Sequence, residues 1–456
     1  MNEKKLGRGI RIAIFFMMKV LFLYFAVLLF IAFRDFFKVK NLDDYVVAGR
    51  NQGTFFVTFS LLATMLGASA TLGICERAKV EGISAFWWLG FGALGLWLQA
   101  LFFSKKIRGF SAKTLPDLVK MVVGERAGRL VALIIAVSWI GVIAAQFAGL
   151  GMFLKLLSES SSEIMIMLAA FLVILYTLLG GQLSVVKTDF VQFILFAIGI
   201  IGTFVFLLLN YSQTTEILIN ENQWSLFGNK FSLGQWLSFA FTISGAFLLG
   251  PDIISRNLIS RSPKVARRSS FMAGFFLILF GVVIACIGIF SGAMYSFAEN
   301  PLFFLTGNIL PFPLAIALCI GMVCALLSSA DTSLINASSI LAYDLFQVKK
   351  VSFVRVVVLI LGILSMLLAL HGKDIISLLL SAYSIYTPGV VCPLAVAIFS
   401  HRKFFVSERF WILGVLVGGI FGVITVFLEN ENSYFPLIGM FFSFVVSLLG
   451  LRKISS

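Results

Sequence analysis

Apolar runs about 20 residues long recur along this chain from about residue 12 to residue 451, with only short polar joints between them. A helix of about that length crosses the hydrocarbon core of a bilayer, and a helix satisfies its own backbone hydrogen bonds there. Of the 456 residues, 60% are hydrophobic and 12% are charged. The sequence therefore predicts an all-α polytopic membrane protein, with no room for an appended soluble domain.

The polar joints divide the chain into about thirteen transmembrane helices. Their predicted bounds are 12–33, 54–75, 82–103, 130–154, 163–180, 189–210, 235–251, 271–295, 311–342, 352–370, 375–399, 409–428 and 434–451. The first run is too long for the apolar region of a signal peptide, and no small-residue cleavage site follows it. We expect it to be a retained helix.

The distribution of Lys and Arg predicts the orientation, because cytoplasmic joints hold these residues in excess. Alternate joints, including 104–129 and 252–270, hold most of the 35 Lys and Arg residues. The opposite joints hold few, among them Arg77, Lys79, Lys230 and Lys373. This asymmetry predicts a multi-pass protein of the cell inner (cytoplasmic) membrane with a cytoplasmic C-terminus and, for an odd number of spans, an external N-terminus. The basic tail before residue 12 opposes that placement of the N-terminus.

The net charge of +14 is accounted for mainly by these joints, so we expect no nucleic-acid partner. Five cysteines and two histidines are scattered along the chain. Their spacing fits neither a disulfide framework nor a metal cluster. No group of His, Cys or carboxylate residues has catalytic spacing, so we expect no enzyme.

The stretch "ALLSSADTSLINASS" (325–339) places polar groups inside a predicted span. At helical periodicity Ala325, Ser328, Ser329, Thr332 and Asn336 share one stripe, with Asp331 at its edge. Small and hydroxyl residues pack membrane helices against each other, which is one interpretation. An ionisable residue in the membrane favours a functional one.

Two further stretches bear on a cation site. Asp189 either begins a helix, where the macrodipole favours an anion, or joins a cation site near the inner surface. In "LLATMLGASATLGICERAKVEG" (61–82), the small residues from Gly67 to Gly73 predict a weakened helix with exposed carbonyls. A break of this kind is tolerated where it lines a cavity or lies buried in protein. Unwound carbonyls and facing hydroxyls form an oxygen cage suited to Na⁺.

The chain resembles the sodium:solute symporter family in four stretches that occur in the family's order. They are "LDDYVVAGR" (42–50), "GASATLGICERAKVEG" (67–82), "YTLLGGQLSVVKTDFVQ" (176–192) and "ALLSSADTSLINASSILAYDLF" (325–346). The joint "GPDIISRNLISRSPKVARRSS" (250–270) resembles the family's cytoplasmic segment between repeats. Relatives often read P-G-x-A-Y where this chain has 75–79, so Glu76 and Arg77 bring charge to the predicted outer mouth.

The resemblance implies a LeuT-like core of two inverted five-helix repeats with the substrate near the midplane. The implied division is 1–53 for an extra N-terminal helix and joint, 54–210 for the first repeat, 211–234 for an external loop, 235–400 for the second repeat, and 401–456 for extra C-terminal helices.

The resemblance also implies cation-binding residues. The family's main sodium site falls here at Ala63, Leu66, Ala325, Ser328 and Ser329. Some members have a second, more cytoplasmic cation site, whose positions map to Asp189, Ser328, Asp331 and Thr332. The residues do not decide whether that second site is filled.

Candidates for substrate binding or gating are fewer. They are Ser69 and Gln146 in the first repeat, and Thr242, Ser244, Phe247, Tyr383 and Tyr386 in the second. Each of them also fits ordinary helix packing.

The predicted function is Na⁺-coupled symport of a small organic solute (an amino acid, carboxylate, vitamin or sugar) by alternating access. A proton-coupled symporter that uses Asp331 or Asp189 is one alternative. A channel or a sensor on a transport fold is another.

Overall fold

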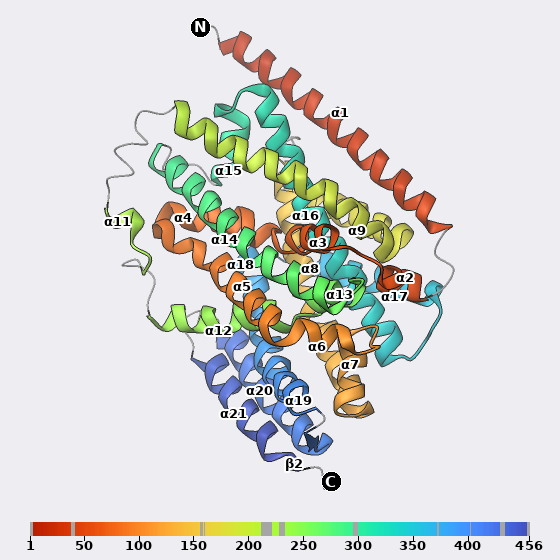
Figure 1. Ribbon diagram of the computed structural model, residues 1–456. Coiled ribbons are helices and arrows are strands. Elements are labelled where there is room, and N and C mark those ends of the chain that lie inside the picture. The colour runs from red at the N-terminus through yellow and green to blue at the C-terminus, as the bar shows by residue number, and fades with distance from the viewer. Residues whose placement is uncertain are drawn as a thin grey trace.

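The computed structural model of the chain describes residues 3–37, 42–155, 158, 160–210, 221–227, 233–294, 300–371, 374–401, 403–428 and 434–453. Within these residues, eleven helical segments are long and apolar enough to cross a membrane, and two shorter apolar helices accompany them. These thirteen correspond to the predicted spans, so the prediction of an all-α polytopic membrane protein is confirmed (Figure 1). Lys230 and Lys373, which we expected on the external side, lie outside the described residues.

The first half of the chain contains α1 (Glu3–Phe36), α2 (Leu42–Val47), α3 (Thr54–Met65), α4 (Ile74–Glu81), α5 (Trp87–Leu98), α6 (Ser104–Gly109), α7 (Leu115–Val122), α8 (Glu125–Lys155) and α9 (Ser162–Asn210). The second half contains α11 (Glu221–Trp224), α12 (Leu233–Leu249), α13 (Pro251–Ile259), α14 (Pro263–Met294), α15 (Pro301–Phe304), α16 (Phe312–Ile340), α17 (Val351–Leu370), α18 (Ile375–Tyr386), α19 (Cys392–Ser400), α20 (Glu408–Leu428) and α21 (Phe435–Leu449). Two short strands, β1 (Phe404–Val406) and β2 (Leu451–Lys453), pair antiparallel.

Two membrane-spanning helices are interrupted near their middle. The first stops at Met65 and resumes through a π-helical turn, Ser69–Gly73, into α4. The second stops at Leu249, and Pro251 begins α13 after Gly250. Each interrupted helix begins one of the two predicted repeats. Paired interruptions of this kind are typical of transporters built from inverted repeats.

Helix α9 consists of two helices joined at Gly181, which has φ 67°. A residue with a side chain is strained at that φ, so glycine suits this turn. The second of the two apolar segments begins at Ser184 rather than near 189. Asp189 therefore lies more than a turn inside the helix, fully buried. This corrects the interpretation of Asp189 as a residue at the start of the helix.

Helix α13 corrects the assignment of 252–270 as a cytoplasmic joint. All nine of its residues are buried, including Asp252 and Arg256. Arg256 is thus an interior residue and does not contribute to the charge of a joint. The segment was assigned to a joint because its two charges and the following basic residues lower its hydropathy.

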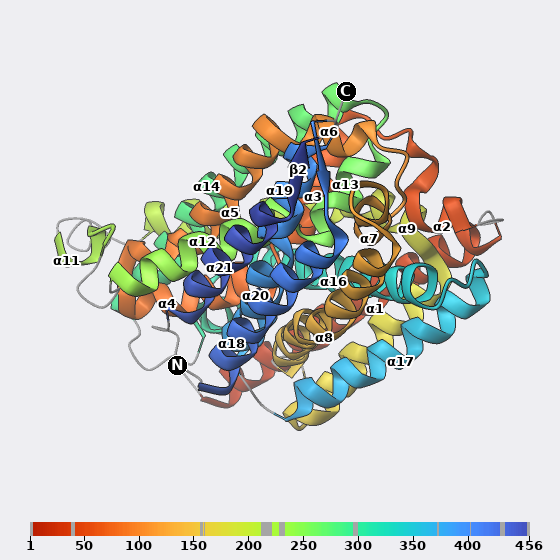
Figure 2. The same ribbon diagram turned by 90° about the horizontal axis from the view of Figure 1, so that it is seen from below.

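The interrupted helices lie inside the bundle and other helices surround them. Helix α1 runs along one edge, against α9 and α16 (Figure 1). Helices α20 and α21 pack together on the opposite side, where they contact α18 and α19 (Figure 2). The additional helices before and after the predicted repeats therefore flank the core from two sides.

Several joints that we assigned to the cytoplasmic side contact one another. The backbone of Gln52 pairs with that of Ile259 and Arg261. The Arg126 backbone N–H donates to Glu408 at the start of α20, and β1, just before that start, pairs with β2, which follows α21. These contacts place the predicted cytoplasmic joints at one end of the bundle, as their Lys and Arg content indicates.

Candidate functional site

The interruption after α3 leaves backbone carbonyls without their helical partners. Leu66 has φ −86° and ψ 43°, which ends the helix. In a continuous helix the Ala68 N–H would donate to the Thr64 carbonyl. Here it donates to the side-chain oxygen of Gln146, 2.8 Å away on α8. Gln146 thereby stabilises the interruption and leaves the Thr64 carbonyl available.

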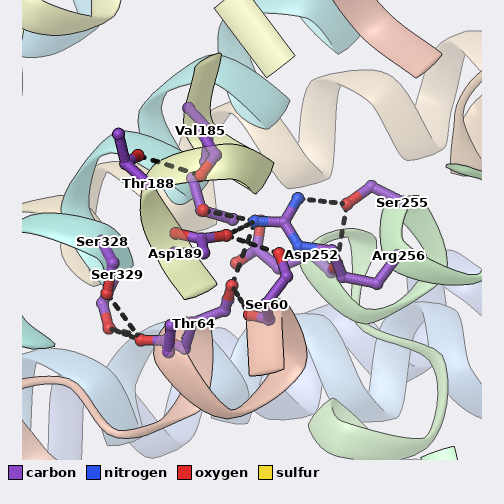
Figure 3. A network of polar contacts seen from close by, with 12 residues as sticks. Ser60, Thr64, Val185, Thr188, Asp189, Asp252, Ser255, Arg256, Ser328 and Ser329 are labelled. Atoms are coloured by element: carbon purple, nitrogen blue, oxygen red, sulfur yellow. Dashed lines mark hydrogen bonds and ion pairs between the residues drawn. The ribbon is translucent and has the colours of Figure 1, made fainter. Parts of the chain in front are cut away.

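Two serines of α16 face these carbonyls. The Ser328 hydroxyl lies 2.8 Å from the Ala63 carbonyl and 3.1 Å from the Ala325 carbonyl. The Ser329 hydroxyl lies 2.9 Å from the Thr64 carbonyl, 3.1 Å from that of Ala63 and 3.0 Å from that of Ala325. Figure 3 shows both serines beside Thr64.

This group has more acceptors than protons. Each hydroxyl carries one proton, so two protons serve the three carbonyls of Ala63, Thr64 and Ala325, and both hydroxyl oxygens keep lone pairs. Leu66 joins Ala63, Ala325 and Ser328 around a small buried space. The five residues that the resemblance assigned to a sodium site are thus neighbours in the structure. Their uncharged oxygens suit a hard cation such as Na⁺.

Glycine at position 67 makes this close approach possible. A Cβ there would lie 2.5 Å from the Gln146 side-chain oxygen and 2.7 Å from the Ser329 hydroxyl oxygen. Gly67 therefore allows side chains of α8 and α16 to approach the non-helical backbone between Met65 and Ser69 from two directions.

A buried arginine occupies the middle of a second polar group. Arg256 is 0% exposed, and its Nη2 lies 3.2 Å from Asp189 Oδ2. The same nitrogen donates to Thr332 Oγ1 at 2.6 Å and to Thr64 Oγ1 at 3.1 Å. Figure 3 shows the guanidinium between Asp189 and the end of α3. Two of the four positions predicted for a second cation site, Asp189 and Thr332, are therefore hydrogen-bonded to Arg256.

Asp331 differs from the other buried acids. It is 0% exposed, and within the described part of the chain neither of its carboxylate oxygens has a hydrogen-bond partner. It lies close enough to Asp189 and Arg256 for electrostatic interaction. An unsolvated carboxylate requires a cation or a proton to offset the loss of hydration.

A larger cavity, the central cavity, lies next to the two serines and spans about 520 Å³ of space not filled by atoms, part of it open to solvent. Thr64 and Ser329 line it together with four of the predicted substrate residues, Ser69, Gln146, Phe247 and Tyr383. The cavity therefore shares two residues with the oxygen cluster, and a ligand in one would directly affect the other.

Three predicted substrate residues do not line this cavity. The Ser244 hydroxyl donates to the Phe91 carbonyl, and the Tyr386 hydroxyl donates to the Leu249 carbonyl. The carbonyl of Thr242 accepts from Thr387. These residues connect α12 to α5 and to the α18–α19 region, and their role in substrate binding or gating stays a prediction.

Sequence reasoning missed several residues of the site, notably Asp252, Trp139, Trp88 and Ser333, which line the cavity. Asp252 accepts from Trp139 Nε1 at 2.8 Å and from Asn336 Nδ2 at 2.7 Å. Asp252 and Arg256 are one turn apart on α13. An acid and a base at helical spacing after Gly-Pro, where the second interrupted helix resumes, were a signal in the sequence.

Arg77, one of the two charged residues expected at the outer mouth, lines a smaller pocket. It lies 3.7 Å from Glu81, and both line this pocket together with Trp88. Trp88 also lines the central cavity, so its side chain separates the two spaces. Glu76 contacts the Asn300 side chain at 3.5 Å.

Comparison with known proteins places this arrangement among transporters. The model of the family "Sodium:solute symporter family" matches residues 45–422. The human high affinity choline transporter 1 is 27% identical over 395 residues, which cover 78% of this chain and 67% of that protein. A sodium/proline symporter of Staphylococcus aureus is 26% identical over 351 residues, which cover 71% of this chain and 67% of that protein.

Solved structures agree on the fold. A Na⁺-coupled sialic acid symporter in a substrate-bound outward-open state superposes with a TM-score of 0.82 at 18% identity, covering 96% of this chain and 99% of the other. MhsT in complex with L-phenylalanine gives a TM-score of 0.59 at 12% identity and covers 87% and 98%. These likenesses confirm the predicted LeuT-like fold of two inverted five-helix repeats.

Proposed function

Because this chain belongs to the sodium:solute symporter family, we propose that it carries one small organic solute across the cytoplasmic membrane together with Na⁺. Secondary active symport is the activity of the proteins it resembles, and Na⁺ is the coupling ion that the family name and the relatives support. The named solutes of the relatives include choline and proline.

The observation that carries the proposal is the excess of oxygen lone pairs around Ser328 and Ser329. We assign the main Na⁺ site to the carbonyls of Ala63, Leu66 and Ala325 and to the two serine hydroxyls. When Na⁺ binds, the hydroxyl protons must turn outward so that their oxygen lone pairs face the ion. The hydrogen bonds of the two hydroxyls to the Ala63 and Ala325 carbonyls would then give way to contacts of these oxygens with the ion.

The position of the site explains how an ion could control solute binding. Na⁺ there joins the interrupted α3 of the first repeat to α16 of the second. Thr64 and Ser329 also line the central cavity, so ordering them prepares the cavity for the solute. The coupling is reciprocal: an ion that strengthens solute binding is bound more tightly when the solute is present.

A proton-coupled symporter is the second candidate, and the state of Asp331 favours it. Its carboxylate is buried without a hydrogen-bond partner among the described residues, as suits a group that carries a proton. The same carboxylate, with Asp189, Ser328 and Thr332, is the proposed second cation site. Arg256 already supplies a positive charge to Asp189 and Thr332, so this proposal centres on Asp331.

Uptake into proteoliposomes tests the coupling ion. The purified protein is reconstituted and given a panel of labelled solutes: amino acids, monocarboxylates, pantothenate, sugars and choline. Each is measured with an inward Na⁺ gradient, with K⁺ replacing Na⁺, and with an inward proton gradient at zero Na⁺. Concentrative uptake that requires Na⁺ supports the proposal. Uptake driven by the proton gradient alone would replace it with the second candidate.

We also propose that the N-terminus is external and the C-terminus cytoplasmic. The grouping of the basic joints at one end of the bundle supports this orientation through the positive-inside rule. Inward movement of Na⁺ would then be driven by both its gradient and the membrane potential, which contributes about 2.3 kcal/mol per charge per 100 mV.

A further inference from the structure

The charge that the described residues bring to the lining of the central cavity is negative. Asp252 is the one charged side chain among the described residues that line it, and no Lys, Arg or His lines it. The other polar groups there, including those of Gln146 and Ser333, are uncharged. A solute bearing a carboxylate would find no cationic side chain to pair with, whereas a solute bearing an ammonium would find a carboxylate.

Three hydrogen bonds hold the Asp252 carboxylate in position, and it can accept one more. Its Oδ2 accepts from Trp139 Nε1 at 2.8 Å and from Ser333 Oγ at 3.1 Å, and its Oδ1 accepts from Asn336 at 2.7 Å. An ionised carboxylate accepts about four hydrogen bonds. Three donors therefore orient the group and leave room for one more positively charged or N–H partner.

Aromatic side chains line the cavity beside this carboxylate. Trp88, Trp139, Phe247 and Tyr383 all contribute to the lining. The Trp139 indole is tied to Asp252 through its N–H and packs edge-on against Tyr386, with ring centroids 5.0 Å apart. Aromatic rings attract cations, and they favour methylated ammonium groups in particular.

The balance of buried charges around the cavity also favours a cationic solute. The polar groups between α3, the second half of α9, α13 and α16 include three buried carboxylates, Asp189, Asp252 and Asp331, and one buried guanidinium, Arg256. Buried charges require partners. The proposed Na⁺ offsets one of the two excess negative charges, and a cationic solute offsets the other.

We propose that the solute is a small monocationic amine with an alkylated ammonium group, which binds Asp252 and the surrounding aromatic rings. This inference rests on the proposed transport function, because it concerns the same cavity. The ammonium lies against Asp252, and the remainder of the solute reaches toward Ser69 and Gln146 near the interruption of the first helix.

Two probes of nearly equal shape test the charge requirement on the unmodified protein. Choline carries a trimethylammonium group, and 3,3-dimethylbutan-1-ol carries an uncharged tert-butyl group in its place. Binding of labelled choline to the purified protein in Na⁺ is measured in competition with each compound. We expect the alcohol to bind at least tenfold more weakly than choline. Equal affinity, or no choline binding, would overturn the proposal.

A variant then assigns the discrimination to Asp252. In Asp252→Asn the tenfold preference should fall toward unity, and Asp252→Glu should restore part of it. The matched control is Asp374→Asn, which changes an acid that caps the start of α18 away from the cavity. A preference that persists in Asp252→Asn would overturn the assignment. If that variant fails to fold, the competition on the unmodified protein still decides.

Na⁺-driven uptake of a neutral or anionic solute, without choline binding, would sink the cationic solute and leave symport intact. Choline binding that discriminates against the alcohol, without any effect of a Na⁺ gradient on uptake, would sink Na⁺ symport and leave the cationic solute.

Discussion

At the scale of single residues, hydroxyl protons govern the oxygen cluster at the first interruption. Ser329 offers one proton to three carbonyls within 3.1 Å. A bound cation would offset the negative charge of the carbonyl oxygens that receive no proton. The serine oxygens can coordinate that cation, which explains why serines are used here. An alanine would remove a ligand and leave the carbonyls without a hydroxyl proton to offset their mutual repulsion.

We therefore expect Ser329→Ala to raise the Na⁺ concentration for half-maximal uptake about tenfold, which corresponds to about 1.4 kcal/mol of ion binding. Ser328→Ala should act in the same direction. Na⁺ dependence is measured in proteoliposomes at a saturating solute concentration. The control is Ser338→Ala on the same helix, since the Ser338 hydroxyl is buried and has no partner among the described residues. An unchanged Na⁺ dependence in both site variants would contradict the assignment.

The buried pair of Arg256 and Asp189 gives a second prediction at this scale. Removing one member of such a pair leaves an unpaired buried charge and costs about 3–5 kcal/mol. Arg256→Gln should therefore lower the thermal stability of the protein in detergent markedly. Melting is followed by a thiol-reactive dye, because four of the five cysteines are buried in the fold.

The double variant Asp189→Asn/Arg256→Gln is the matched control for that measurement. It removes both charges and keeps hydrogen-bonding groups at both positions, so it should recover much of the lost stability. If the double variant melts below Arg256→Gln, the pair does not act as a unit.

At the scale of elements, the interruption between α3 and α4 depends on close contacts with two neighbouring helices. The Gln146 side-chain oxygen of α8 accepts a hydrogen bond from the Ala68 N–H. The Ser329 hydroxyl of α16 lies beside the carbonyls that the interruption leaves without helical partners. Both contacts lie next to Gly67, where a side chain would occupy the space that they need. The interruption between α3 and α4 thus joins α8 and α16 through its backbone atoms. Small changes at this interruption should affect ion binding before they affect the fold.

Gly67→Ala tests this dependence. Its Cβ would lie 2.5 Å from the Gln146 oxygen and 2.7 Å from the Ser329 oxygen, so one of them must move. We expect Na⁺-dependent uptake to fall at least tenfold, with the protein still folded by size-exclusion chromatography. Gly419→Ala on α20 is the control, because a Cβ there meets no atom within 4 Å. Full Na⁺-dependent uptake in Gly67→Ala would rule out the tight approach.

The elements also show why some of the site could be anticipated and some could not. Serines 328 and 329 follow helical periodicity, and the run of small residues from 67 predicts a weak helix, so both halves of the cluster were visible in the sequence. Helix α13 was not, because Asp252 and Arg256 make a buried helix resemble a polar joint. Their burial depends on partners contributed by α3, α8, α9 and α16, which no local pattern reveals.

At the scale of the whole molecule, apolar length and charge asymmetry account for most of the architecture. They predict the thirteen spans and their grouping by side. They do not specify which residues line a cavity, because that depends on how helices distant in sequence turn toward each other. Ser244 and Tyr386 illustrate this, since each hydroxyl is turned to a neighbouring helix's carbonyl although each lies close in sequence to Phe247 or Tyr383.

The orientation of the bundle is the last prediction, and introduced cysteines test it. Asn308 and Lys453 are both exposed, at opposite predicted sides of the membrane. The basic joints at one end of the bundle predict that end to be cytoplasmic. A membrane-impermeant maleimide should therefore label Asn308→Cys in intact cells, and Lys453→Cys only after the cells are permeabilised. The unsubstituted chain gives the background from its native cysteines, and the reverse labelling pattern would invert the orientation and with it the direction of Na⁺-driven transport.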